Sequence, residues 1–341
     1  MKLLRPSFGR LGYRGRAELC IVTSDLLRAN PLGDPDRREL GVYLPPGHDD
    51  GRRFPVIYLL CGFTGRGQRY LEPHPWFRSV AQGFEAAILA GDSEPAILVS
   101  PDCFTRLGGS QYVDSSATGP YARHVVEELA PLVDEYFPTL AGRRGVVGKS
   151  SGGFGALHLA MRHPGVFRAA ASISGDVDFE LCFGQEILGA MRGLAPFEMD
   201  PARFLEEFAR RPELSGDGHA VINILAMSAC YSPNPDAPLG FDLPMELERG
   251  ERIAEVWERW LAFDPLRACE AHADALRGLD FLHLECGLRD EFNLQWGLRR
   301  FVRSLVALDV PHVHEEHSGG HRGTDERYRR VLPKLAAVLA G

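Results

Sequence analysis

A glycine-rich segment from Arg143 to Pro164 contains the residues best suited to nucleophilic chemistry. In RRGVVGKSSGGFGALHLAMRHP, the letters GKS could end a phosphate-binding loop, and GKSSG also matches the G-x-S-x-G turn of serine hydrolases. The phosphate loop requires glycine five residues before Gly148, where this chain has Arg143. The hydrolase turn places glycines on both sides of Ser150, where larger side chains would collide. We therefore predict Ser150 as a nucleophile on a sharp strand–turn–helix.

A serine hydroxyl is a poor nucleophile unless a base removes its proton and an acid orients that base. In this type of turn the partners follow in chain order, first the acid and then a histidine, each on a loop after a strand. Asp290 follows the strand-like FLHLEC, and His321 follows two glycines. We predict the triad Ser150, Asp290 and His321. Other candidates are Asp176 and Glu291 for the acid, and three neighbouring histidines for the base: His312, His314 and His317.

Two backbone N–H groups are candidates to stabilise the negative charge that develops on a substrate oxygen. Ser151 begins the helix after the turn, so the helix dipole lies behind its N–H. Phe63 lies in LLCGFTG, where Gly62 permits close approach of the backbone. We predict an oxyanion hole from Phe63 and Ser151, although Phe63 also fits a simple turn with a buried ring.

Short runs rich in β-branched residues alternate with helical patterns, which indicates an α/β fold with a mostly parallel sheet. The predicted strands are 17–23, 38–45, 55–61, 96–100, 145–148, 169–174, 281–286 and 312–317. The first two are expected to be antiparallel. The predicted helices are 76–90, 121–136, 151–163, 291–308 and 325–339.

The strand–helix rhythm stops between Asp176 and about Ala275. Because an unstructured loop of this length is improbable in a compact domain, we expect a helical cap at 177–275 inserted into a single domain, 1–341. Its stretch YSPNPDAPLGFDLP (231–244), with Trp76 and Phe77, suggests an apolar pocket for an acyl or aryl group. The pair Trp257 and Trp260, at helical spacing, is expected to pack inside the insertion.

Composition excludes several classes of function. The 341 residues are 45% hydrophobic and carry a formal net charge of −8 without a run of cations, which argues against a nucleic-acid partner. The N-terminus has no apolar run of signal-peptide length, and no 18 consecutive apolar residues occur, so we expect a cytoplasmic protein without membrane partners. Seven scattered cysteines are expected to be reduced and mostly buried: Cys20, Cys61, Cys103, Cys182, Cys230, Cys269 and Cys286.

Histidines and glutamates in HVHEEHSGGH suggest a metal site, but the spacing HEEH differs from the H-E-x-x-H of zinc hydrolases. The letters GRG at 65–67 lack the rest of a dinucleotide-binding motif. We therefore expect neither a metal nor an organic cofactor.

Four segments together carry a resemblance to a known family. They are VYLPPGHDDGRRFPVIYLLCGFTG, GKSSGGFGALHLAMRHPGVFRAAASISG, GLRDEF and GGHRGTDERY. This ordered set resembles the esterase branch of α/β-hydrolases that includes esterase D and S-formylglutathione hydrolases. The resemblance implies an α/β-hydrolase fold and places Ser150, Asp290 and His321 at the triad positions, with Phe63 and Ser151 at the oxyanion positions. This chain has Cys61 where the family commonly has histidine or aspartate.

These observations predict a hydrolase of carboxylic esters that works through an acyl-enzyme on a small-molecule substrate. The same groups could pass the acyl group to a sugar or alcohol, which would make the protein an acyltransferase. A binding protein with an inactive site is a further alternative, disfavoured by the complete triad. The natural ester and any homo-oligomeric state stay open.

Overall fold

The structure is a computed structural model that describes residues 12–73, 76–214, 216–323 and 325–341. Residues 1–11, on which the expected absence of an export signal partly rests, lie outside this description. In the described part, no helix is long and apolar enough to cross a membrane. All seven cysteines are buried free thiols, as predicted.

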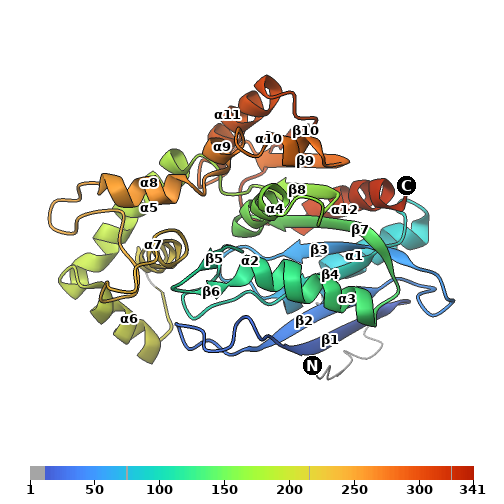
Figure 1. The fold of residues 1–341 in the computed structure, drawn as a ribbon, viewed down its shortest axis with the longest axis horizontal. Coiled ribbons are helices and arrows are strands. Elements are labelled where there is room, and N and C mark those ends of the chain that lie inside the picture. Colours follow the sequence, from blue (N-terminus) through green and yellow to red (C-terminus); the bar gives the residue numbers. More distant parts are fainter. Residues whose placement is uncertain (1–11, 74–75, 215, 324) are drawn as a thin grey trace.

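A central sheet runs through the molecule, with helices on both faces (Figure 1). In the described residues its order is β1-β2-β4-β3-β7-β8-β9-β10. The strands are β1 (Arg16–Thr23), β2 (Arg37–Leu44), β3 (Phe54–Leu60), β4 (Ile97–Pro101), β7 (Thr139–Lys149), β8 (Ala169–Ile173), β9 (Phe281–Gly287) and β10 (Val313–His317). β2 pairs antiparallel with β1 and β4, and the other neighbours are parallel. The predicted α/β class and antiparallel entry are confirmed.

Side chains of the central strands alternate between two apolar clusters, one on each face of the sheet. On β3, Ile57 and Leu59 belong to one cluster, and Val56 and Tyr58 to the other. The first cluster includes residues of α1 (Val80–Ala90) and α12 (Asp325–Ala340). The second includes residues of the continuous helical stretch formed by α2 (Tyr121–Arg123), η2 (His124–Leu129) and α3 (Ala130–Tyr136), and of α4 (Ser151–Arg162) and α11 (Leu294–Ala307). Burial on both faces explains why these strands read as almost entirely apolar.

Three element boundaries differ by three residues or more from those predicted. α1 begins at Val80 instead of 76 because Ser79 and Gln82 form a capping box, which marks the first turn. α11 begins at Leu294 instead of 291, since Asn293 has a φ of 61° and cannot continue a right-handed helix. β7 begins at Thr139, before the predicted 145, because its first residue pairs with Phe54 of β3.

The region between β8 and β9 is helical, and α5 to α8 lie to one side of the sheet, at the left of Figure 1. Its helices are α5 (Phe179–Leu194), η3 (Ala195–Phe197), α6 (Pro201–Arg210), α7 (Gly218–Tyr231), α8 (Ala254–Leu261), α9 (Pro265–Ala268) and α10 (Ala273–Arg277). Trp257 and Trp260 are buried there, with ring centroids 5.5 Å apart, as predicted. Two smaller elements complete the chain outside this region: η1 (Gly67–Tyr70) and the hairpin β5 (Asp114–Ser115) with β6 (Gly119–Pro120).

An aromatic cluster joins these helices to α4. Phe154 of α4 lies 5.7 Å from Tyr231 of α7, and Tyr231 lies 5.4 Å from Trp260 of α8, measured between ring centroids. Phe183 of α5 packs against the same Trp260 at 5.5 Å. Because α4 begins immediately after Ser150, this packing also fixes α5 and α7 relative to the predicted nucleophile.

Candidate active site

Ser150 occupies a strained turn between β7 and α4. Its φ of 57° and ψ of −129° lie in a region that L-residues rarely adopt. The backbone N–H of Ser150 donates to Ile173 O of β8 at 3.0 Å, which anchors the turn to the sheet. This is the strand–turn–helix that the sequence predicts, and it places the residue at the carboxyl end of a central parallel strand.

Gly148 and Gly152 are required by the close packing of this turn. A Cβ added to Gly148 would lie 2.2 Å from the carbonyl carbon of Gly152. A Cβ added to Gly152 would lie 2.1 Å from Leu60 O at the end of β3. Both distances are far below any tolerable contact, so the predicted reason for these glycines is confirmed.

The three predicted triad residues meet in one chain of hydrogen bonds. His321 Nε2 lies 3.1 Å from Ser150 Oγ, and His321 Nδ1 lies 2.8 Å from Asp290 Oδ2. Asp290 also accepts a hydrogen bond from the backbone N–H of Phe292 at 3.0 Å. The histidine and the aspartate are buried, at 6% and 3% exposure, which shields their interaction from water. Such a chain can pass the serine proton to the imidazole while the carboxylate stabilises the resulting imidazolium.

The electrostatics of Asp290 suit the acid of such a chain. Burial by itself would raise the pKa of Asp290, but the hydrogen bond and charge of His321 outweigh it and lower the pKa. The carboxylate therefore stays ionised at neutral pH, and it can hold the proton of Nδ1 in place.

The alternative acids contact other groups. Glu291 Oε2 accepts a hydrogen bond from the backbone N–H of His321 at 2.5 Å, so it holds the loop instead of the ring. Asp176 Oδ2 lies 3.3 Å from Ser151 Oγ, and burial raises the pKa of Asp176 to about 6. Neither carboxylate occupies the position at Nδ1 that Asp290 holds.

The three alternative histidines also have other partners. His312 Nδ1 lies 2.8 Å from Val310 O, His317 Nδ1 accepts from the backbone N–H of Gly319 at 3.2 Å, and His314 Nε2 lies 4.0 Å from Glu316. Only His321, among the described histidines, is hydrogen-bonded to Ser150 Oγ.

The two predicted oxyanion donors lie on either side of Ser150. Ser151 is the first residue of α4, so its N–H has no acceptor within the helix. The loop of Phe63 approaches from β3, where a Cβ added to Gly62 would lie 3.2 Å from Ser150 Cβ. The ring of Phe63 lines the cavity and packs edge-on against His219 at 5.8 Å. The oxyanion role of the two N–H groups stays a prediction.

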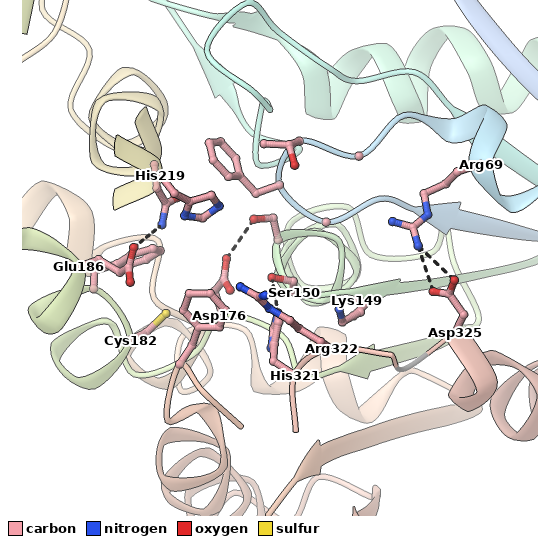
Figure 2. A pocket seen from close by; sticks show the side chains of 18 of the residues that line it. Arg69, Lys149, Ser150, Asp176, Cys182, Glu186, His219, His321, Arg322 and Asp325 are labelled. Carbon is pink, nitrogen blue, oxygen red and sulfur yellow. Dashed lines mark hydrogen bonds and ion pairs between the residues drawn. The ribbon is translucent and has the colours of Figure 1, made fainter. Parts of the chain in front are cut away.

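A cavity of about 280 Å³ opens at Ser150, and most of its side chains are polar. Figure 2 shows its labelled residues around Ser150. Its charged, imidazole and amide side chains, besides the triad, are Arg69, Lys149, Asp176, Glu186, His219, Asn223, Arg322 and Asp325. Of these residues, the sequence had indicated only Asp176 as a candidate for the site. One clue was present: Asn223 interrupts the otherwise apolar run AVINILAM.

The predicted apolar pocket is wrong in its position. No described residue of 231–244 lines the cavity at Ser150, and neither Trp76 nor Phe77 does. Residues 233–243 instead line a separate groove of about 1030 Å³, together with residues of α8. Arg259 of α8 holds this segment through Pro233 O at 3.3 Å and through Asp242, which keeps it away from Ser150. Trp76 and Phe77 are 87% and 60% exposed.

A cluster of His283, Glu285 and Glu315 could in principle hold a metal, because its ligand atoms lie within 4.8 Å of one another. However, Arg327 already bonds both oxygens of Glu285 at 2.6 and 2.9 Å, and Lys334 bonds Glu315. The cluster lies outside the cavity at Ser150. Its carboxylates are matched by cationic side chains, which fits an ion-pair network between β9, β10 and α12 better than a metal centre.

A mostly parallel sheet flanked by helices, with a strained serine turn after a central strand, is an α/β-hydrolase fold. The sequence matches the family model described as "Putative esterase" over residues 35–296, and the protein belongs to this esterase family. It is accordingly a carboxylic ester hydrolase. The matched region contains Ser150 and Asp290 and ends before His321.

Solved structures with the same fold include several esterases. The chain is similar to an S-formylglutathione hydrolase from Agrobacterium tumefaciens, with a TM-score of 0.62, 18% identity and coverage of 99% of this chain and 100% of that one. It is also similar to the fluorophosphonate-binding serine hydrolase F of Staphylococcus aureus, with a TM-score of 0.59, 14% identity and coverage of 94% and 98%. A ferulic acid esterase from Anaeromyces mucronatus gives a TM-score of 0.57 at 13% identity, covering 96% and 92%.

Proposed function

We propose that the protein hydrolyses carboxylic esters through an acyl-enzyme formed on Ser150. The observation that carries the proposal is the hydrogen-bonded chain from Ser150 Oγ through His321 to Asp290. His321 takes the proton of Ser150 as the oxygen attacks the ester carbonyl carbon, and then gives it to the leaving alcohol. Water attacks the acyl-enzyme in the second half of the reaction, with His321 again acting as the base. Asp290 holds the imidazole in the required tautomer.

The backbone N–H groups of Phe63 and Ser151 are proposed to stabilise the tetrahedral oxyanion. Their support is the position of Ser151 at the start of α4 and the approach of the loop of Gly62 to Ser150. A donor of this kind contributes about 3 kcal/mol to transition-state stabilisation.

We further propose that the chain is one hydrolase domain and that 177–275 serves as its cap. This is supported by residues from α5 and α7, such as Glu186 and Asn223, which line the same cavity as Ser150. A cap of this kind would close one side of the substrate site and select the group bound there.

A fluorophosphonate probe tests the nucleophile directly. The wild-type protein should react at one residue, identified as Ser150 by peptide mass spectrometry, and the Ser150→Ala variant should not react. Hydrolysis of para-nitrophenyl acetate should be lost in the same variant. Labelling at another residue, or unchanged hydrolysis by Ser150→Ala, would overturn the proposal. Repeating the assay with an added alcohol acceptor measures any acyl transfer.

A further inference from the structure

The cavity at Ser150 has two sides of opposite character. Figure 2 shows Asp176, Glu186 and His219 on one side of Ser150, and Lys149, Arg69 and Asp325 on the other, while Arg322 lies beside His321. On the second side Asp325 is already paired with Arg69, at 3.1 Å. The first side, which we call the acidic lobe, is formed by Asp176, Cys182, Phe183, Glu186, His219 and Asn223.

Hydrogen-bond acceptors dominate the acidic lobe. Asp176 is 6% exposed and accepts from Ser151 Oγ and Gln111 Nε2, both at 3.3 Å, through the same oxygen, Oδ2. Glu186 accepts from Asn223 Nδ2 at 3.3 Å. Asn223 is 8% exposed, and its Oδ1 receives no hydrogen bond from the residues that the structure describes. The lobe thus presents two carboxylates and the amide oxygen of Asn223, which still have capacity to accept.

The charges of Asp176 and Glu186 both influence one further side chain of the lobe, Cys182. The thiol of Cys182 lines the lobe, and its pKa is raised well above the usual value, first by burial and then by the charges of Asp176 and Glu186. Burial raises the pKa of Asp176 only to about 6, so this carboxylate is mostly ionised at neutral pH. Negative charge therefore converges beside the nucleophile.

Other carboxylates of the same helix region are neutralised by arginines. Asp178, two residues after Asp176, is bonded to Arg300 at 2.7 Å, and Glu180 is bonded to Arg252. In contrast, neither Asp176 nor Glu186 forms an ion pair with a Lys or Arg of the described residues. A partly buried carboxylate without a cation is costly, and a positively charged ligand would offset that cost.

We propose that the acidic lobe binds a cationic group of the substrate, so that the preferred esters carry an ammonium or a similar positive charge. This inference rests on the proposed ester hydrolysis at Ser150. The ammonium would donate to Asp176, Glu186 and Asn223 Oδ1 while the ester carbonyl lies at Ser150 Oγ. The bound charge would replace the arginine partners that the neighbouring carboxylates have.

Two sets of esters test the charge preference on both sides of the scissile bond. On the acyl side, para-nitrophenyl 6-aminohexanoate is compared with the neutral heptanoate and with the anionic adipate monoester. On the alcohol side, acetylthiocholine is compared with its neutral isostere, 3,3-dimethylbutyl thioacetate. The quaternary ammonium of acetylthiocholine has no N–H, so this pair tests the positive charge alone, whereas the aminohexanoate tests charge and hydrogen bonding together. For at least one set, kcat/KM should be about tenfold or more higher for the cationic ester. Equal values in both sets, or a preference for the anionic ester, would overturn the inference.

Variants of Glu186 test whether the acidic lobe causes the preference for cationic esters. Glu186→Gln should lower the ratio of kcat/KM between the cationic and neutral esters, and Glu186→Lys should favour the adipate monoester. Glu94→Gln, on an exposed loop outside the cavity, is the matched control and should keep the wild-type ratio. An unchanged ratio in both Glu186 variants would contradict the assignment.

Labelling of Ser150 with a fluorophosphonate distinguishes a failure of this inference from a failure of the proposed ester hydrolysis. A variant that still labels at the wild-type rate retains a folded site, so a change in its selectivity reports on the lobe. If the wild-type protein labels at Ser150 but shows no charge preference, only this inference fails. If Ser150 does not label, the proposed function fails with it.

Discussion

The molecule has a polar cavity at Ser150 and a separate apolar groove, and Ser150 and His321 line only the cavity. The cavity at Ser150 is lined mainly by polar and charged groups, whereas the groove of residues 233–243 and α8 is lined mainly by prolines, leucines and other apolar residues. The sequence suggested that the apolar segment would bind the substrate, but this segment lies apart from the triad. An apolar, proline-rich stretch therefore marked a packing surface, whereas Asn223, a polar residue inside an apolar helical run, marked the site.

The largest expected effect comes from comparing one substitution in the cavity with one in the groove. Ser150→Ala should lower kcat for ester hydrolysis by about 10⁴-fold or more, because the nucleophile is removed. Leu243→Ala, which alters the groove, should leave kcat/KM within about twofold, since no described residue lines both the groove and the cavity at Ser150. Steady-state kinetics with para-nitrophenyl acetate measures both. A comparable loss in Leu243→Ala would mean that the groove takes part in catalysis.

A second contrast lies at the acid position of the triad, between two adjacent carboxylates. Asp290→Asn should lower kcat by about 10⁴-fold, because an amide favours the wrong imidazole tautomer. Glu291→Gln should have a much smaller effect, since Glu291 bonds the backbone N–H of His321 and not its ring. The same kinetic assay applies, with urea denaturation as a check on folding. A larger loss in Glu291→Gln would reverse the assignment of the acid.

A third comparison concerns the stability cost of replacing a glycine beside the cavity, Gly152, and a glycine beside the groove, Gly240. Gly152→Ala should lower the free energy of unfolding by about 3 kcal/mol or more, because its Cβ would clash with Leu60 O. Gly240→Ala meets no atom within 4 Å and strains only a φ of +78°, so it should cost about 1–2 kcal/mol.

Urea denaturation measures both free energies. Gly184→Ala in α5, which has an ordinary φ and whose nearest neighbour would lie 3.9 Å away, is the control and should be neutral or slightly stabilising. If Gly152→Ala were as stable as this control, the close approach of α4 to β3 would be wrong.

The smallest expected effect concerns pH and a buried histidine of α4 that lines neither the cavity nor the groove. His158 of α4 is stacked between Phe154 and Phe263, at 5.6 and 6.0 Å, and burial lowers its pKa from 6.5 to about 3. Below about pH 6.5 the unfolded chain binds this proton and the folded protein does not. The stabilising contribution of neutral His158 is therefore complete above pH 6.5 and is lost as the pH falls toward 3, by up to about 1.4 kcal/mol per pH unit.

The variant His158→Leu isolates this contribution. Asp176 and Asp264, whose pKa values burial raises to about 6, act in the opposite direction, since their contribution is lost as the pH rises from about 4 to 6. These carboxylates are present in both proteins, so the difference between wild type and variant reports on His158. Urea denaturation from pH 7 to pH 4.5 should show a smaller loss of stability in the variant. Parallel losses would contradict the low pKa.

Much of the fold followed from local patterns. Apolar runs and their alternation with helical segments predicted the strands of the central sheet, because a strand buried on both faces must be apolar along its length. Errors fell at the ends of elements, such as Ser79 and Asn293, where one cap or one dihedral angle decides the boundary.

The sequence by itself predicted the three residues that the structure joins in one chain of hydrogen bonds. Crowding requires glycines around Ser150, and the chain order of an α/β-hydrolase indicates which later loops carry Asp290 and His321. Only the tertiary structure decided the character of the cavity. Glu186 and Asn223 face Ser150 because aromatic packing between α4, α5, α7 and α8 sets the orientation of helices that are distant in the chain. Which side chains meet at the cavity depends on long-range packing. The sequence of one helix does not predict which other helix it will pack against.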